Sequence, residues 1–219
     1  QEHNSGNGIH VWHCSNVRVT DNHLTHLRDG IYFEFVTDSH VANNISITNL
    51  RYGLHFMFSN NNDYYDNWFE DNGAGVAVIE ENTIGINVEG STRINYTNND
   101  LIKNGWAVKI AGGCYANNFS DNNFVGNSFD VSYNSKMNDN KFDNNYWSSY
   151  TGYDLDKDGV GDVPYRPVKL FSYIVNQTPE TIILLRSMFI DILNFSEKVS
   201  PVFTPDHLVD ATPKMKWIK

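Results

Sequence analysis

An acidic loop between positions 154 and 162 has the spacing of a calcium site. Its sequence is DLDKDGVGD, which places carboxylates at loop positions 1, 3, 5 and 9, glycine at 6 and a backbone carbonyl at 7. Such a ring of oxygen atoms suits a hard cation such as Ca²⁺. Tyr165 replaces the bidentate glutamate of an EF-hand, so we predict a structural site without catalytic chemistry. Its expected ligands are Asp154, Asp156, Asp158, Val160 through its carbonyl oxygen, and Asp162. A solvated acidic turn is the alternative.

A second group of possible metal ligands lies near the beginning of the chain, where most of the histidines occur. Where apolar residues alternate along a strand, the residues between them point outward. This pattern predicts two neighbouring outward columns, one of His10, Tyr32 and His55 and the other of Trp12, Glu34 and Met57. Imidazole and thioether groups suit Cu(I). We therefore expect an exposed copper site with His55 and Met57 as preferred ligands and Glu34 and His10 as secondary ones. A ladder that binds no ligand is the alternative for any single histidine.

The elements that carry these columns repeat with a period of 22 to 23 residues. Each repeat has a Gly-apolar-x-apolar segment followed by an asparagine-led arm, and the asparagines are Asn22, Asn44, Asn67, Asn99, Asn122 and Asn140. Short strands with asparagine and glycine at the corners predict a parallel β-helix, in which each coil packs only against its neighbours. The fold class we expect is therefore all-β, a right-handed parallel β-helix with coils of about 22 residues, the calcium-type loop and a short C-terminal helical tail. Asparagines at one corner are expected to form a side-chain ladder.

The repeat predicts three regions. Residues 1–145 form the coils, 146–167 form the Asp-rich loop that closes the helix, and 168–219 form a helical docking or capping segment. The spacing fails between Gly75 and Gly85, so we expect residues to be missing near 78–82, with a decorated coil as the alternative. The sequence also begins directly in repeat-like residues, which suggests a mature or trimmed fragment.

The segment from 179 to 195 reads as one helix with proline at its start. Its apolar positions run almost all the way round, although it is too short to cross a membrane. It is expected to cap the open end of the β-helix or to dock on a partner protein. Removing everything after Pro167 is expected to leave a folded β-helix. The docking residues predicted are Leu184, Leu185, Met188, Phe189 and Ile192.

Composition excludes some classes of function. The net charge is −10 and the basic residues form no run, which argues against nucleic-acid binding. Cys14 and Cys114 lie about four coils apart, roughly 19 Å at about 4.8 Å per coil, so both are expected to be free thiols.

A sugar-cleaving enzyme needs paired carboxylates, or a carboxylate with a basic residue. Glu34 and Asp29 are the nearby candidates and no Lys or Arg is expected in their columns, so we predict no enzyme. A carbohydrate-binding or carbohydrate-cleaving β-helix remains the alternative, and a purely structural adhesin leaves the His and Met columns unexplained.

Several motifs over nearly the whole chain resemble the NosD family. They are Asn145-Tyr146-Trp147-Ser148, Gly152-Tyr153-Asp154-Leu155-Asp156, the block from Asp158 to Pro167, Tyr52-Gly53-Leu54-His55-Phe56-Met57-Phe58, Asp29-Gly30-Ile31-Tyr32-Phe33, Leu185-Arg186-Ser187 and Thr204-Pro205. The Trp- and Asp-rich block is the specific part, whereas the coil repeats match many β-helices. This resemblance also supports missing residues between Gly75 and Gly85.

The resemblance implies a periplasmic accessory factor for maturation of nitrous oxide reductase. Such a factor acts with an ABC transporter permease and ATPase, a copper chaperone lipoprotein and the reductase itself. It handles copper, transiently and as Cu(I), and reaches the membrane only through these partners. The helical tail then becomes the element expected to dock on the permease.

Overall fold

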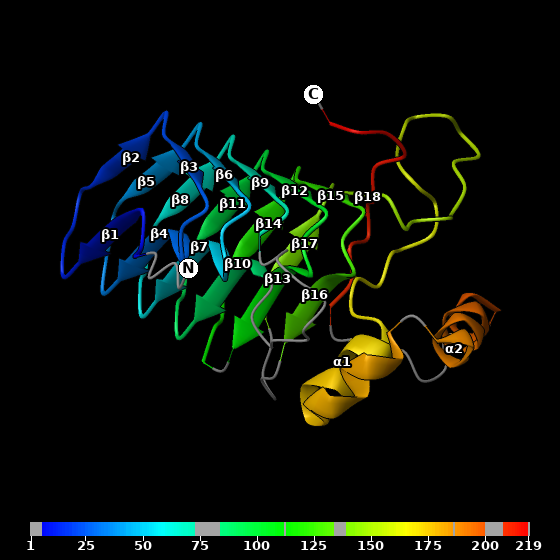
Figure 1. Cartoon of the computed structure of the whole chain (residues 1–219). Coiled ribbons are helices and arrows are strands. Elements are labelled where there is room, and N and C mark those ends of the chain that lie inside the picture. Colours follow the sequence, from blue (N-terminus) through cyan, green and yellow to red (C-terminus); the bar gives the residue numbers. More distant parts are fainter. Residues whose placement is uncertain are drawn as a thin grey trace.

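The computed structural model describes residues 6–72, 84–111, 113–133, 139–185, 187–199 and 208–218. Within them the chain winds into a parallel β-helix, consistent with the right-handed form expected from the sequence (Figure 1). Three parallel sheets of six strands each form its sides. The first sheet contains β1 (Ile9–Trp12), β4 (Asp29–Glu34), β7 (Tyr52–Met57), β10 (Ile84–Glu89), β13 (Trp106–Ala111) and β16 (Phe129–Tyr133). The second contains β2 (Arg18–Thr20), β5 (His40–Ala42), β8 (Asp63–Tyr65), β11 (Asn95–Thr97), β14 (Asn118–Ser120) and β17 (Lys141–Asp143). The third contains β3 (His23–Thr25), β6 (Ile45–Ile47), β9 (Trp68–Glu70), β12 (Asp100–Ile102), β15 (Asn123–Val125) and β18 (Tyr146–Trp147).

Alternation along the strands sets the inside of the helix. Ile31 and Phe33 on β4 and Leu54 and Phe56 on β7 are fully buried, and they lie in register one coil apart. Aromatic rings also stack inside the helix, as in Tyr64, Tyr96, Phe119 and Phe142 of the second sheet. Each such pair contributes about 0.5–1.5 kcal/mol beyond its buried area. The core is therefore a set of columns parallel to the helix axis.

The predicted asparagine ladder is present at the turn before the third sheet. Asn22 donates to Asn44 at 2.9 Å, and the same contact repeats through Asn67, Asn99, Asn122 and Asn145. These side chains also accept from backbone N–H groups of the previous coil, which satisfies polar groups buried at the corner. Asn140 is the exception to the predicted series, because it pairs with Asn117 at another corner.

Coil length is regular except at one place. Side chains one coil apart are separated by 22 or 23 residues in most of the ladder and by 32 between Asn67 and Asn99. Strand β10 nevertheless stacks directly on β7, with Ile86 opposite Leu54. Positions 78–82, where we expected missing residues, lie outside the described residues.

The C-terminal segment of the chain returns to close the end of the β-helix. Asp210 is fully buried, and one of its carboxylate oxygens accepts hydrogen bonds from the backbone and side chain of Asn145 and from the indole of Trp147. It therefore takes the next position of the asparagine ladder. Leu208 adds to the core cluster. The last rung of the β-helix therefore comes from residues more than 40 positions after Pro167, and folding of a chain truncated after Pro167 stays a prediction.

The tail contains three short helical elements instead of one long helix. They are α1 (Leu170–Gln177), the 3-10 turn η1 (Pro179–Leu184) and α2 (Met188–Val199). Proline has no N–H to continue a helix and restricts the residue before it, which explains why α1 ends before Pro179. Helix α1 packs on β16, where Phe171 lies beside Phe129. The single helix predicted over 179–195 is therefore wrong in its bounds.

The structure also bears on the cysteines and on membrane-spanning helices. Cys14 is exposed and Cys114 buried, and both are free thiols, as predicted. Among the described residues, no helix is long and apolar enough to cross a membrane.

Candidate functional site

The two outward columns of the first sheet form as the alternation predicts. His10, Tyr32 and His55 are in register on β1, β4 and β7, with ring centroids 4.6 and 4.5 Å apart and nearly parallel planes. Glu34 lies opposite Met57 in the next column, and its carboxylate is 3.9 Å from Nε2 of His10. The structure thus brings the four predicted copper ligands onto one face, on three consecutive coils.

His55 differs from the expected exposed ligand, because it is only 9% exposed. Tyr32 stacks on one side of its ring, and the ring of Tyr52, from the start of the same strand, lies 4.5 Å away. Both ring nitrogens are buried without a hydrogen-bond partner. Burial lowers the pKa of His55 from 6.5 to about 4, so the imidazole is neutral at pH 7. A neutral imidazole with unused nitrogen atoms has the chemistry of a metal ligand.

An ion pair supports the aromatic cover of His55. Arg51 binds the fully buried Asp29 in a bidentate pair of 2.9 and 2.5 Å, and its guanidinium lies 5.0 Å from the ring centre of Tyr52. Arg28 adds a second cation at 3.6 Å. Asp29 is therefore already neutralised by two arginines, which weakens its candidacy as a carboxylate for sugar cleavage.

The prediction that no basic residue shares these columns was wrong. Lys109 stands opposite Asn87, which stands opposite His55, so the column continues to a lysine two coils away. Sequence reasoning missed it because the irregular coil obscures the alignment. This lysine lies on the opposite side of His55 from Glu34, and the pair does not form a sugar-cleaving arrangement.

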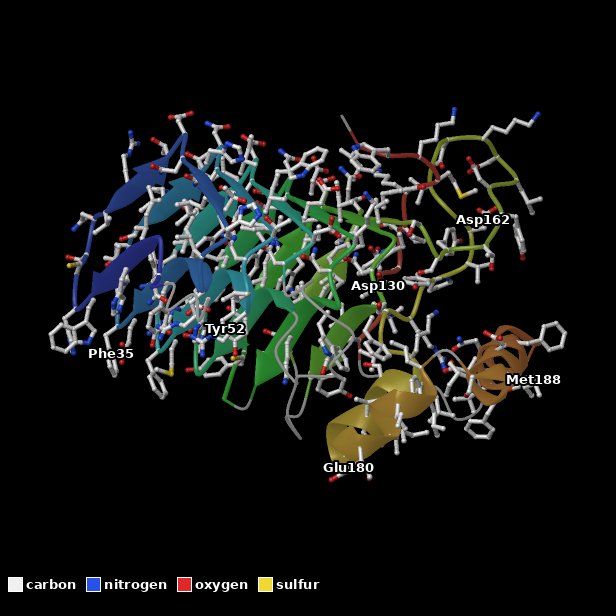
Figure 2. The ribbon with its side chains drawn as sticks, viewed as in Figure 1. Phe35, Tyr52, Asp130, Asp162, Glu180 and Met188 are labelled. Carbon is white, nitrogen blue, oxygen red and sulfur yellow. The ribbon has the colours of Figure 1, made fainter. Side chains whose placement is uncertain are left out.

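An exposed aromatic ladder borders the same face and was also missed. His13, Phe35 and Phe58 follow the first-sheet strands at the corner, with centroids 4.6 and 5.3 Å apart. Phe35 is labelled in Figure 2. All three have φ near +50°, which β-strand patterns do not suggest. Trp12 is 60% exposed beside them. The signal in the sequence was the aromatic residue placed directly after Glu34 and again after Met57.

The acidic loop lies at the other end of the molecule and brings together three of its four aspartates. Asp154, Asp156 and Asp158 each offer a carboxylate oxygen, and these atoms lie within 4.8 Å of one another. In the part of the chain that the structure describes, this is the one group of three or more His, Cys, Asp or Glu side chains so arranged. Asp162 instead accepts a hydrogen bond from the backbone of Leu155.

Hydrogen bonds and repulsion compete in this loop. Asp154 is partly desolvated, which raises its pKa, but the backbone N–H groups of Gly159 and Lys157 donate to it and lower that pKa overall. For Asp156, the N–H of Asp158 donates to its carboxylate, yet the charge of Asp158 raises its pKa overall. The geometry therefore keeps like charges close together, which a cation would relieve.

The predicted docking residues divide into two groups. Met188, Phe189, Ile192 and Leu184 are exposed, by 77%, 57%, 57% and 40%. Leu185 instead packs against a buried cluster of Trp106, Phe129, Phe171, Val175 and Ile190. Helix α2 therefore buries one side and leaves an apolar side open.

Comparisons with known proteins agree with the motifs in the sequence. A family model described as "Periplasmic copper-binding protein (NosD)" matches residues 1–84, which include all four predicted copper ligands. A protein of Stutzerimonas stutzeri named "Probable ABC transporter binding protein NosD" is 32% identical over 122 residues. A protein of the same name from Pseudomonas aeruginosa is 29% identical over 145 residues. Residues 1–84 of the chain are therefore similar to the NosD family.

The match to these two NosD proteins is partial in length. It covers 54% and 65% of this chain but only 28% and 32% of the relatives. The NosD family model covers the coils that carry His10, Glu34, His55 and Met57, and it ends at residue 84. The acidic loop and the helical tail lie outside that model, so their roles are argued from their own geometry.

Proposed function

We propose that this chain is a non-enzymatic periplasmic accessory factor that receives Cu(I) and passes it on during assembly of the copper sites of nitrous oxide reductase. The observation that carries the proposal is His55, a neutral buried imidazole whose two nitrogen atoms have no partner. Unpartnered buried polar groups are rare in folded proteins and call for an explanation. The description of the matching family, a periplasmic copper-binding protein, supports copper as that explanation.

The surroundings of His55 suit a transient copper site. Met57 follows it on the same outward face, and Glu34 lies one coil away. Thioether and imidazole ligands favour Cu(I). Because Tyr32 and Tyr52 cover the imidazole, copper reaches its nitrogen atoms only when one of these rings moves. The rate of copper binding and release is then set by motion of these side chains, which suits a protein that passes copper on to another protein.

An anaerobic Cu(I) competition titration against a chromophoric chelator tests the site. The wild type is compared with a His55→Phe/Met57→Leu double variant, in which both side chains are replaced by apolar ones that still fill the space. His40→Ala is the matched control, because His40 lies on the second sheet and pairs with Asp63. One-to-one binding that the double variant loses and the control retains supports the proposal.

Failure of the wild type to compete for Cu(I) contradicts copper binding by the isolated chain. A Tyr52→Ala variant adds a kinetic test, because removal of the ring that covers His55 is expected to speed copper uptake. Equal rates in the two proteins contradict the covering role of Tyr52.

The acidic loop has a structural role in this proposal, with Ca²⁺ bound by Asp154, Asp156, Asp158, the Val160 carbonyl and Asp162. The loop contacts the returning tail, because Gly161 donates to the carbonyl of Pro213 and Met215 donates to that of Gly159. A cation that fixes the loop therefore also fixes the segment that closes the β-helix. Calcium is part of the scaffold in this scheme, and copper is the cargo.

The open side of α2 is the proposed contact with an ABC transporter permease, whose ATPase works with it. The names of the two relatives, ABC transporter binding proteins, support this partner. Exposed apolar surface of this kind marks interaction sites. A copper chaperone lipoprotein and nitrous oxide reductase are the proposed donor and recipient of copper. Contact with the membrane is proposed only through these partners.

Co-purification with the transporter complex in detergent tests this contact. Phe189→Ser/Ile192→Ser removes two apolar groups that are each 57% exposed, so the fold is expected to survive while the complex is lost. Leu155→Ser is the matched control, because Leu155 is 77% exposed in the acidic loop. Retention of the transporter by the double variant contradicts docking through α2.

A further inference from the structure

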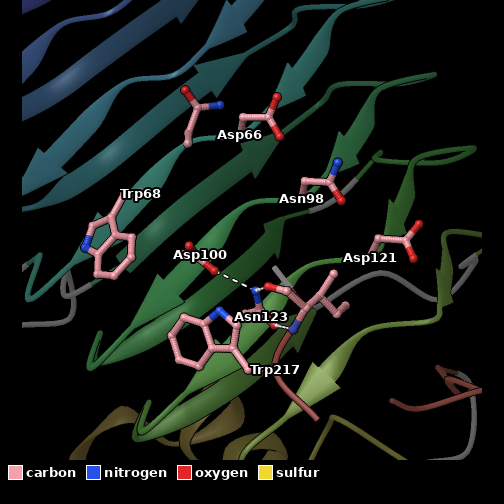
Figure 3. A pocket seen from close by; sticks show the side chains of 9 residues that line it. Asp66, Trp68, Asn98, Asp100, Asp121, Asn123 and Trp217 are labelled. Carbon is pink, nitrogen blue, oxygen red and sulfur yellow. Dashed lines mark hydrogen bonds between the residues drawn. The ribbon is translucent and has the colours of Figure 1, made fainter. Parts of the chain in front are cut away.

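A pocket unrelated to the copper face lies between the third sheet and the C-terminal end of the chain. It is lined by Asp66, Asn67, Trp68, Asn98, Asp100, Asp121, Asn123, Trp217 and Ile218, and its volume is about 320 Å³ (Figure 3). Asp66, Asn98 and Asp121 line one edge, at corners where the backbone has φ near +55°. Trp68, Asp100 and Asn123 line the other, on adjacent strands in register.

The end of the chain builds one wall of this pocket. The side chain of Asn123 holds Ile218 through two hydrogen bonds of 2.9 Å, one donated to its carbonyl and one accepted from its N–H. This clamp places Trp217 between Trp68 and Tyr146, at centroid distances of 6.5 and 6.2 Å. Trp217 is nevertheless 40% exposed, so the pocket retains an accessible aromatic surface.

The charge of the pocket is one-sided. Three carboxylates line it and none of the lining residues is basic. Burial raises the pKa of Asp100, and the amide of Asn123 is the side chain that donates to it, at 2.7 Å. Asp66 and Asp121 lie two coils apart along the opposite edge, with Asn98 between them. A cleft lined by one sign of charge attracts ligands of the other sign.

We infer that this pocket binds an arginine side chain of a partner polypeptide. A guanidinium stacks on indole rings and donates two parallel hydrogen bonds to a carboxylate, so it matches both the tryptophans and Asp100. It is also more weakly hydrated than the ammonium of lysine, which favours entry beside the half-buried Asp100. A saccharide also stacks on tryptophan, but it is neutral and leaves the three carboxylates without a counter-charge. The pocket lies on the third sheet, away from the first-sheet copper ligands, so this contact is independent of copper binding.

Binding of a fluorescently labelled Gly-Arg-Gly-Arg-Gly peptide at low salt, measured by anisotropy, tests the inference. Citrulline and lysine versions of the peptide remove the charge and the planar group in turn. We expect the arginine peptide to bind, the citrulline peptide to bind roughly tenfold or more weakly, and lysine to fall between them. Asp100→Asn and Trp217→Ala are each expected to weaken arginine binding roughly tenfold.

Asp38→Asn is the matched control, because Asp38 is an exposed corner aspartate with φ of +52° that does not line the pocket. Circular dichroism melting confirms that each variant is folded. Equal binding by all variants, or no binding by folded wild type, overturns the inference. Binding of an oligosaccharide such as chitotriose in place of the arginine peptide also overturns it and assigns the pocket to sugars. None of these outcomes depends on the copper titration.

Discussion

Replacing His55 by phenylalanine is expected to change how the stability of the protein depends on pH. The pKa of the folded-state imidazole is about 4, against 6.5 when it is solvated. Between these values the unfolded chain binds a proton that the folded chain does not, so stability rises with pH in this window and is lost as pH falls. The phenylalanine keeps the contacts with Tyr32 and Tyr52 but has no proton to bind.

The expected magnitude follows from these two pKa values. At about 1.36 kcal/mol per pKa unit, this histidine costs the wild type about 2 kcal/mol of unfolding free energy between pH 7 and pH 5. The full effect, reached below pH 4, is about 3.4 kcal/mol. Phenylalanine also removes two unpartnered polar atoms, so the variant is expected to equal or exceed the wild type in stability at pH 7.

Urea unfolding of both proteins at pH 7 and pH 5, followed by tryptophan fluorescence, measures this difference. Other titrating groups contribute equally to the two proteins, so the comparison isolates His55. The variant is expected to gain about 2 kcal/mol relative to the wild type on acidification. If the difference between the two proteins is the same at both pH values, His55 is solvated and the argument for a covered imidazole fails.

Three other changes test the scaffold. Asp210→Ala leaves the buried donors of Asn145 and Trp147 unpaired, so it is expected to lower the unfolding free energy by about 3 kcal/mol or more in the same urea assay. An unchanged unfolding midpoint contradicts the role of Asp210 as the last ladder position. Adding Ca²⁺ is expected to raise the melting temperature of the wild type and not of Asp156→Asn, and equal shifts in both exclude calcium binding in the loop. Gly30→Ala places a Cβ 2.6 Å from the carbonyl oxygen of the next coil, so it is expected to cost about 1–3 kcal/mol, and a neutral result in thermal melts shows that the coils separate easily.

The sequence by itself determined the coil architecture and which side chains of each strand point inward or outward. A β-helix is built from contacts between neighbouring repeats, so short-range alternation and the 22- to 23-residue spacing contain the required information. The same locality placed His10, Tyr32 and His55 in one column and predicted most of the asparagine ladder. It failed at Asn140, because other corners of the coils also carry stacked asparagines, and at Lys109, because the coil before it is longer.

Only the tertiary structure decided which of these positions are accessible. His55 points outward as alternation predicts, yet Tyr52 and Tyr32 cover it, and the packing of large rings around a site is not encoded in strand periodicity. The last rung and the third-sheet pocket depend on Asp210 and Trp217, which reach strands more than 60 residues earlier in the sequence. Local patterns do not specify such long-range closure, because it is set by how side chains from distant segments share hydrogen bonds and buried space. The repeat thus determines the frame, and the returning tail determines how that frame ends.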